Sequence, residues 1–145
     1  MVLDDSPAMV LATWLQQVAI GVDPLIGGAT GWPIFVDQEA DLPNEALAVY
    51  NTAGVVDGRI HNTGETIVHE GIQFSARSAS LLLARQKIDE IALKVDALIQ
   101  TPVTVGSNRY NINAINKTSG VLYAGPDSKT RQKYTLNATA TIQEL

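Results

Sequence analysis

The fold is decided by residues 69–100, HEGIQFSARSASLLLARQKIDEIALKVDALIQ, because the period of the apolar side chains changes within this stretch. Up to Arg77, apolar and polar residues alternate, which predicts a strand over residues 66–77 with one side facing the core. That side carries Ile72, Phe74 and Ala76. After Ser78 or Ser80, either of which can cap a helix, apolar residues recur every three or four positions. The stretch therefore predicts a strand followed by a long helix that continues to its end.

The apolar stripe of this helix should pack against a sheet. The stripe consists of Leu81, Ala84, Ile88, Ile91, Val95 and Leu98. A second strand, residues 134–142, also alternates cleanly and offers a matching apolar side, with threonine and asparagine on the opposite side. We expect the helix to contact a sheet face formed by Ile72, Phe74, Tyr134, Leu136 and Ala138.

Further elements on both sides complete a single domain. Ser6 and Pro7 begin a helix over residues 7–20, since serine caps free amides and proline is tolerated at the first helical position. Strands are expected at 32–38, 46–58, 66–77, 109–115, 120–124 and 134–142. The sequence thus predicts one α/β (α+β) domain over residues 1–145, in the order α-β-β-β-α-β-β-β. Its sheet should be mostly antiparallel or mixed, with about five to six strands.

The composition excludes several kinds of chemistry. The 145 residues include no cysteine, which excludes disulfides, zinc–thiolate sites and thiol catalysis. An apolar fraction of 46% and a charged fraction of 17% are typical of a globular chain. Asp4 and Asp5 stand where a signal peptide would be basic, and no stretch approaches the roughly 20 apolar residues of a membrane span. Neither secretion nor membrane insertion is expected.

The net charge of −5 is distributed unevenly along the chain. Residues 1–76 carry one base and ten acids, a sum of −9, whereas residues 77–145 carry nine bases and five acids, a sum of +4. A net acidic chain is a poor candidate for tight DNA binding, because phosphate contacts need lysine and arginine. The two parts could instead attract each other between copies of the protein. The alternative is that both sets of charges are solvated surface.

Two motifs that suggest metal sites fail on closer reading. His69 is followed by glutamate, as in zinc-protease helices, but that motif needs a second histidine four residues later, where Gln73 stands. The acidic run that begins at Asp37 resembles a calcium loop, but Leu42 and Ala48 occupy the places of its glycine and final glutamate. The sequence contains no nucleophile-elbow or phosphate-loop motif. We therefore expect no catalytic, cofactor-binding or metal-binding residues.

The middle of the chain resembles a known family. Residues 32–78, WPIFVDQEADLPNEALAVYNTAGVVDGRIHNTGETIVHEGIQFSARS, then the long helix and YTLNATATI, resemble the tail terminator proteins of long-tailed bacteriophages. These are often labelled minor capsid or minor tail proteins. The resemblance implies a small α/β fold that assembles as a six-membered ring. Such a ring caps the finished tail tube, stops its polymerisation and offers a surface for head–tail joining.

The resemblance also implies a location and a set of partners. The protein would be a structural part of the virion, at the head-proximal end of the tail, after assembly in the cytoplasm of the host bacterium. Its partners would be other copies of itself in a homohexameric ring, the tail tube protein, and the head connector or neck protein. Phage DNA would pass through the lumen without specific binding, and no membrane would be contacted.

Charged segments between the strands are the candidate subunit interface. Acids gather before the second expected strand, and bases gather before the last one. They are Asp37, Glu39, Asp41, Glu45, Lys129, Arg131 and Lys133. Polar segments between strands reach outward and are too charged for an unpaired place in the core. We expect the acids of one copy to meet the bases of its neighbour.

Three other functions remain open at this point. A head-completion or neck connector protein would also be small and ring-forming, and a tail tube protein would polymerise rather than stop growth. A small hydrolase-type enzyme could use His61 or His69 with Glu65 or Glu70. Loss of activity in a His69→Ala or Glu70→Ala variant that keeps its fold would favour the enzyme.

Overall fold

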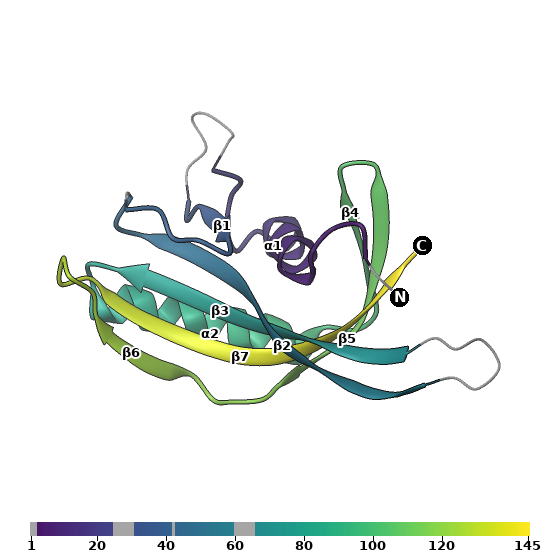
Figure 1. The fold of residues 1–145 in the computed structure, drawn as a ribbon. Coiled ribbons are helices and arrows are strands. Elements are labelled where there is room, and N and C mark those ends of the chain that lie inside the picture. The colour runs from purple at the N-terminus through teal and green to yellow at the C-terminus, as the bar shows by residue number, and fades with distance from the viewer. Residues whose placement is uncertain (1–2, 25–30, 42, 60–65) are drawn as a thin grey trace.

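A computed structural model describes residues 3–24, 31–41, 43–59 and 66–145. One curled sheet and two helices form the molecule (Figure 1). The elements are α1 (Pro7–Gln17), β1 (Ile34–Val36), β2 (Ala46–Arg59), β3 (Thr66–Ser78), α2 (Leu81–Ala97), β4 (Thr101–Val105), β5 (Asn108–Lys117), β6 (Leu122–Pro126) and β7 (Gln132–Glu144). The α+β class and the predicted order of elements are confirmed, with β4 as an additional strand.

The sheet is mixed, as expected. Its strands run in the order β1-β2-β3-β7-β5-β4, and β6 pairs with β7 beyond the end of the β5 pairing. Only β1 and β2 pair in parallel among the described strands, and the other pairs are antiparallel. The register aligns Phe74 with Val49 on one side and with Leu136 on the other. Partners in register share a face, so these three side chains form the centre of one sheet face.

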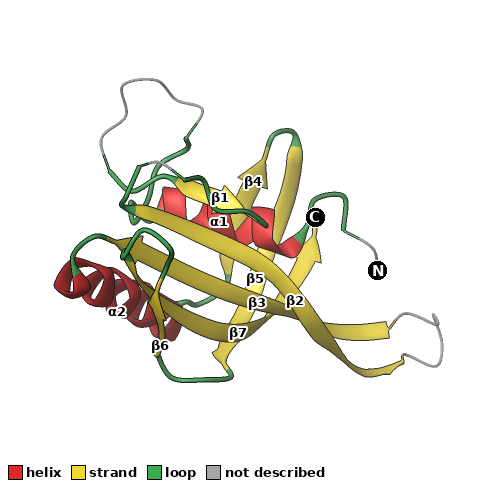
Figure 2. Ribbon diagram, turned by 60° about the vertical axis from the view of Figure 1, so that its left-hand side comes forward, coloured by secondary structure: helices red, strands yellow, loops and turns green. Residues whose placement is uncertain are grey.

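Both helices lie on this same face, behind the sheet in Figure 2. The backbone N–H of Ala8 in α1 donates to Asn51, which pairs in register with Ile72. On α2, Asp96 pairs with Lys117, whose register partner is the buried Ala138. A single core therefore fills the space between the helices and the curled sheet. We call the opposite side of the sheet the outer face.

The expected core is confirmed for most of its residues. The sheet face contributes Ile72, Phe74, Tyr134, Leu136 and Ala138, and the helix contributes Ala84, Ile88, Ile91 and Val95. Leu81 was expected in this stripe and is exposed, and Leu98 is half-buried. The reason is that β3 ends at Ser78, opposite the first residue of β7, so the sheet stops beneath the first turn of α2.

The ends of both helices differ from the expectation. Ser80 is the cap of α2, and the helix ends at Ala97 rather than Gln100 because residues 98–100 lead directly into β4. Helix α1 ends at Gln17 rather than at residue 20, and Ala19 follows with a left-handed φ of 61° that cannot continue a helix. Within the described ranges, no helix is both long and apolar enough to span a membrane.

Strand β4 was not expected because Pro102 looked like the stop after the long helix. Proline lacks an N–H donor and is tolerated in a strand only at an edge. Strand β4 is such an edge, since it pairs with β5 alone among the described strands. The carbonyl of Pro102 accepts a hydrogen bond of 3.2 Å from the side chain of Gln17. This contact ties the edge strand to α1.

Candidate functional site

The connection between β1 and β2 folds over the outer face of the sheet and is held there by Arg77. This arginine is only 2% exposed, although it belongs to the polar side of β3. Its guanidinium donates to the carbonyls of Ala40 at 2.6 Å, Pro43 at 2.8 Å and Asn44 at 3.2 Å. One buried charge thereby satisfies three carbonyls of an irregular segment.

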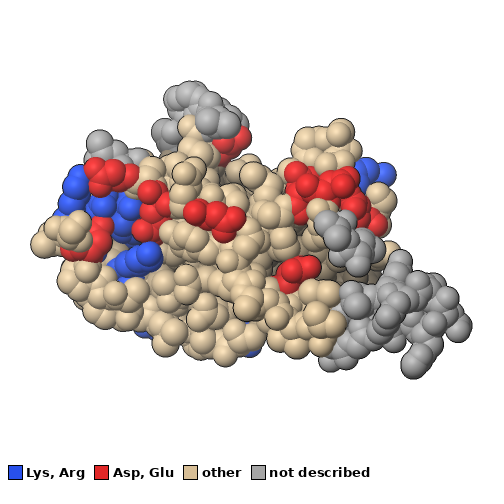
Figure 3. Space-filling view, in the orientation of Figure 1, with Lys and Arg blue, Asp and Glu red and all other residues tan. Residues whose placement is uncertain are grey.

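The turn between β6 and β7 fastens the same connection from the other side. Arg131, 6% exposed, donates to the carboxylate of Asp127 at 2.7 Å and to the backbone carbonyl of Asp41. Lys129 forms an ion pair with the Asp41 carboxylate, and Lys133 lies 3.0 Å from the carboxylate of Glu39. We call these groups, with Arg77, the charged clamp. Figure 3 shows acids and bases gathered at this end of the molecule.

The clamp shifts the titration of its carboxyl groups. The hydrogen bond from Arg131 lowers the pKa of Asp127 to about 2, and backbone N–H donors add to the effect. The hydrogen bond from Lys129 lowers the pKa of Asp41 below its ordinary value. Both shifts favour the charged form of the carboxyl group, because nearby positive charge and N–H donors stabilise a carboxylate.

The sequence-predicted interface residues are therefore brought together only in part, and within one chain. Glu39 and Asp41 meet Lys129, Arg131 and Lys133 of the same molecule. The other two acids lie apart from the bases: Asp37 accepts from the backbone and side chain of Asn51 at 2.8 and 2.6 Å, and Glu45 accepts from Ser78 at 3.2 Å. A role of these seven residues in a subunit interface stays a prediction. Five of them pair with one another within a single chain.

Sequence reasoning missed Arg77 and Asp127 as parts of this arrangement. Arg77 was recognised only as the end of a strand, because its partners are backbone carbonyls 33 to 37 positions away and leave no side-chain pattern. Asp127 stands four residues before Arg131, and this spacing was the one available signal. Aspartate near the start of a turn commonly accepts from following backbone N–H groups, as Asp127 does here.

Beyond the clamp, the outer face carries polar side chains of β3 and β7 that pair with one another. The side chain of Gln73 donates to Asn137 at 3.1 Å, and Nδ1 of His69 lies 2.8 Å from the hydroxyl of Thr141. In the described ranges, no group of three or more histidine and carboxylate side chains could hold a metal ion. His61 and Glu65, which were considered for an enzyme, lie outside the described residues. So does Leu42, which was considered as a position of the calcium-loop motif.

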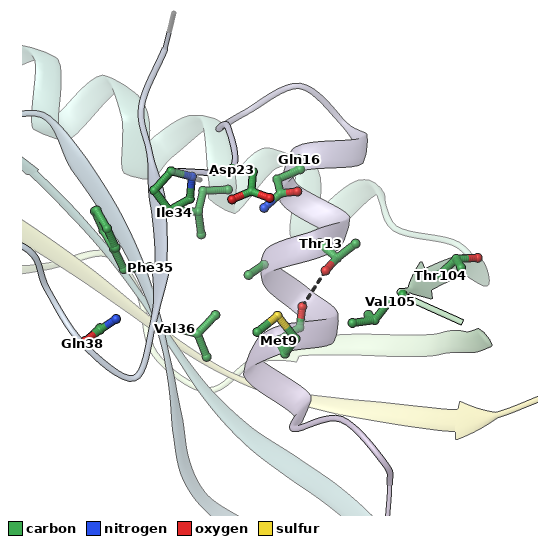
Figure 4. A pocket seen from close by; sticks show the side chains of 13 residues that line it. Met9, Thr13, Gln16, Asp23, Ile34, Phe35, Val36, Gln38, Thr104 and Val105 are labelled. Carbon is green, nitrogen blue, oxygen red and sulfur yellow. Dashed lines mark hydrogen bonds between the residues drawn. The ribbon is translucent and has the colours of Figure 1, made fainter. Parts of the chain in front are cut away.

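A groove of about 840 Å³ lies between α1, β1 and the β4–β5 turn (Figure 4). Its lining includes apolar side chains from all three elements: Met9, Ala12, Ile34, Phe35, Val36 and Val105. Asp23 is the one titratable side chain among the described residues that line it. General acid–base catalysis needs positioned proton donors and acceptors, so this lining is better suited to binding than to catalysis.

The β2–β3 hairpin extends beyond the rest of the sheet as a two-stranded arm, residues 52–59 and 66–70 (Figures 1 and 2). At its base the pairing register shifts between Thr52 and Val55. A Cβ at Gly54 would lie 2.6 Å from the carbonyl oxygen of His69, and one at Gly71 would lie 2.3 Å from that of Ala53. Only glycine permits this close approach, and such bulges redirect a strand pair. The base of the arm therefore fixes its direction.

The comparison with known proteins covers nearly the whole of this fold. Residues 14–144 match the family model described as bacteriophage tail terminator protein, from the middle of α1 to the last residue of β7. No curated protein matches the chain.

Proposed function

The chain belongs to the bacteriophage tail terminator family, and we propose that it ends the growth of a phage tail tube by closing the tube with a ring. The family match over residues 14–144 carries this proposal. It makes the protein a structural component of the virion tail. The ring would consist of six copies, would stop the addition of tube subunits, and would present its other surface to the head connector or neck protein.

Features of the subunit support a role in assembly. The arm and the groove next to α1 are surfaces that one chain leaves uncovered. A ring formed by head-to-tail contacts needs two different surfaces on each subunit, and the arm and the groove are two such surfaces. The charged clamp fastens the β1–β2 connection to the sheet within each subunit.

The charge of the chain suits the passage of DNA. The net charge of −5 does not favour the dense lysine and arginine contacts that hold phosphates, and the bases of the charged clamp are paired with carboxylates or carbonyls of their own chain. We propose that DNA passes through the ring without specific binding. The protein would take its place at the head-proximal end of the tail after assembly in the bacterial cytoplasm.

Tube polymerisation in vitro tests the capping function. Purified tube protein of the same phage is allowed to polymerise, and tube length is measured with and without this chain. A terminator should stop elongation at substoichiometric amounts, because only tube ends need to be covered. Unchanged tube growth together with binding to isolated heads would indicate a neck or head-completion protein instead.

An enzymatic role has less support. His69 and Glu70 are neighbours on β3, so their side chains point to opposite faces of the sheet. They cannot face one substrate together without a change of the strand. A capping protein needs no catalytic residues, and we propose that this chain acts by contact alone.

A further inference from the structure

Three consecutive leucines begin α2 and remain exposed. Leu81, Leu82 and Leu83 are 51%, 64% and 45% exposed. Successive residues of a helix point about 100° apart, so one packing face cannot cover all three. On the helix side of the sheet, the exposed Tyr123 packs against Tyr134 with its ring tilted by 56° and the ring centres 5.3 Å apart.

These side chains form one surface at the end of the molecule. The guanidinium of Arg85, one turn after the leucines, lies 5.6 Å from the ring of Tyr134 and so joins the helix to the tyrosines. The end patch is Leu81, Leu82, Leu83 and Tyr123. The exposed Leu122 does not belong to it, because its register partner Thr135 places it on the outer face. Contiguous exposed apolar surface of this kind marks an interaction site more often than a free surface. Strand β6 also pairs with β7 alone among the described strands, which leaves its second edge open.

The arm carries exposed apolar side chains at the other end of the molecule. Val55 and Val56 are 55% and 65% exposed, and because successive strand residues point to opposite faces, each face of the arm presents one of them. A two-stranded ribbon is only marginally stable in water without a covering layer. The eight residues 52–59 of β2 can reach about 27 Å at about 3.4 Å per residue.

We propose that the arm of one copy lies on the end patch of the next copy and so links the subunits of the ring. The inference rests on the proposed ring. Figure 1 places the arm and the start of α2 at opposite ends of the folded molecule, as a head-to-tail contact requires. The open edge of β6 can accept backbone hydrogen bonds from the arm.

Disulfide trapping tests this contact, and the cysteine-free chain is suited to it. The double variant Val56→Cys with Leu82→Cys is oxidised mildly, alone and with tail tubes, and is separated on a non-reducing gel. Disulfides form only when the two Cα atoms come within about 7 Å. The matched control pairs Val56→Cys with Leu93→Cys, which is equally exposed and lies on the same helix face, but about 16 Å further along α2. We expect covalent oligomers from the first variant and none from the control.

Single substitutions provide a second measurement. Leu82→Glu should raise the protein concentration for half-maximal ring formation by about tenfold, and Leu93→Glu should leave it unchanged. Rings seen by electron microscopy without the Val56–Leu82 cross-link, or equal cross-linking of both double variants, would overturn the contact while the capping function stands. Cross-linked rings that fail to stop tube growth would support the contact and refute the capping function. Absence of both rings and cross-links would overturn both.

Discussion

Replacing Arg77 by methionine should release the β1–β2 connection from the outer face of the sheet. The substitution keeps a side chain of similar length but removes the guanidinium that donates to the carbonyls of Ala40, Pro43 and Asn44. Because Arg77 is only 2% exposed, water has little access to its hydrogen bonds with these three carbonyls. The variant should still fold, since the apolar core lies on the other face of the sheet.

The size of the effect follows from the three lost contacts. A hydrogen bond that involves a charged group contributes about 1.5–3 kcal/mol, which gives an upper range of about 4.5–9 kcal/mol for three. The carbonyls belong to a surface connection and can regain water once the connection lifts, and the desolvation of the arginine is also relieved. We therefore expect the free energy of unfolding to fall by about 2–4 kcal/mol, a large part of the 5–15 kcal/mol of a typical domain.

Urea unfolding followed by circular dichroism measures this loss. Arg109→Met is the matched control, since Arg109 is exposed, and it should change the free energy of unfolding by less than about 0.5 kcal/mol. A free energy of unfolding for Arg77→Met within about 0.5 kcal/mol of the parent would refute the reasoning. The connection would then be held by the other clamp residues without Arg77.

Three further substitutions test the core, the arm and the clamp. Phe74→Ala should cost about 3–5 kcal/mol in urea unfolding, because Phe74 is fully buried at the centre of the sheet, and a loss below about 1 kcal/mol would contradict this. Gly71→Ala should lower the melting temperature because its Cβ would lie 2.3 Å from a carbonyl of β2, whereas Gly120→Ala, with no atom within 4 Å, should not. Asp127 has its pKa lowered from 3.8 to about 2 by Arg131, so its contribution to stability is present above pH 4 and lost towards pH 2. Asp127→Asn should therefore show a weaker loss of stability between pH 4 and pH 2 than the parent, and equal slopes would count against the clamp.

Local sequence patterns predicted the parts of the fold that depend on local periodicity. The alternation in β3 and β7 placed Phe74 and Leu136 on the same apolar face of the sheet, and the register pairs these two residues. The cap at Ser80 and the apolar stripe identified α2 and three of its buried residues in addition to Ala84. These features repeat every two or every three to four residues, and that period indicates which side of the element is buried.

Features that depend on distant partners could not be predicted in the same way. Leu81 fits the stripe of α2 but lies where the sheet has already ended, which only the tertiary structure reveals. Glu39 and Asp41 were expected to meet Lys129, Arg131 and Lys133, but sequence cannot distinguish pairing within a chain from pairing between chains. Arg77 binds carbonyl groups, which every residue carries, so no residue type signals its partners.

Electron microscopy of the purified chain mixed with tail tubes tests the central claim most directly. The tubes are imaged after the chain is added, and again after an excess of tube protein is supplied. We predict a closed ring at one end of each tube, formed by contacts between copies of this chain, and no further elongation from that end. Long tubes built by this chain alone, or continued growth from ends that carry it, would contradict its assignment as the protein that closes the tail.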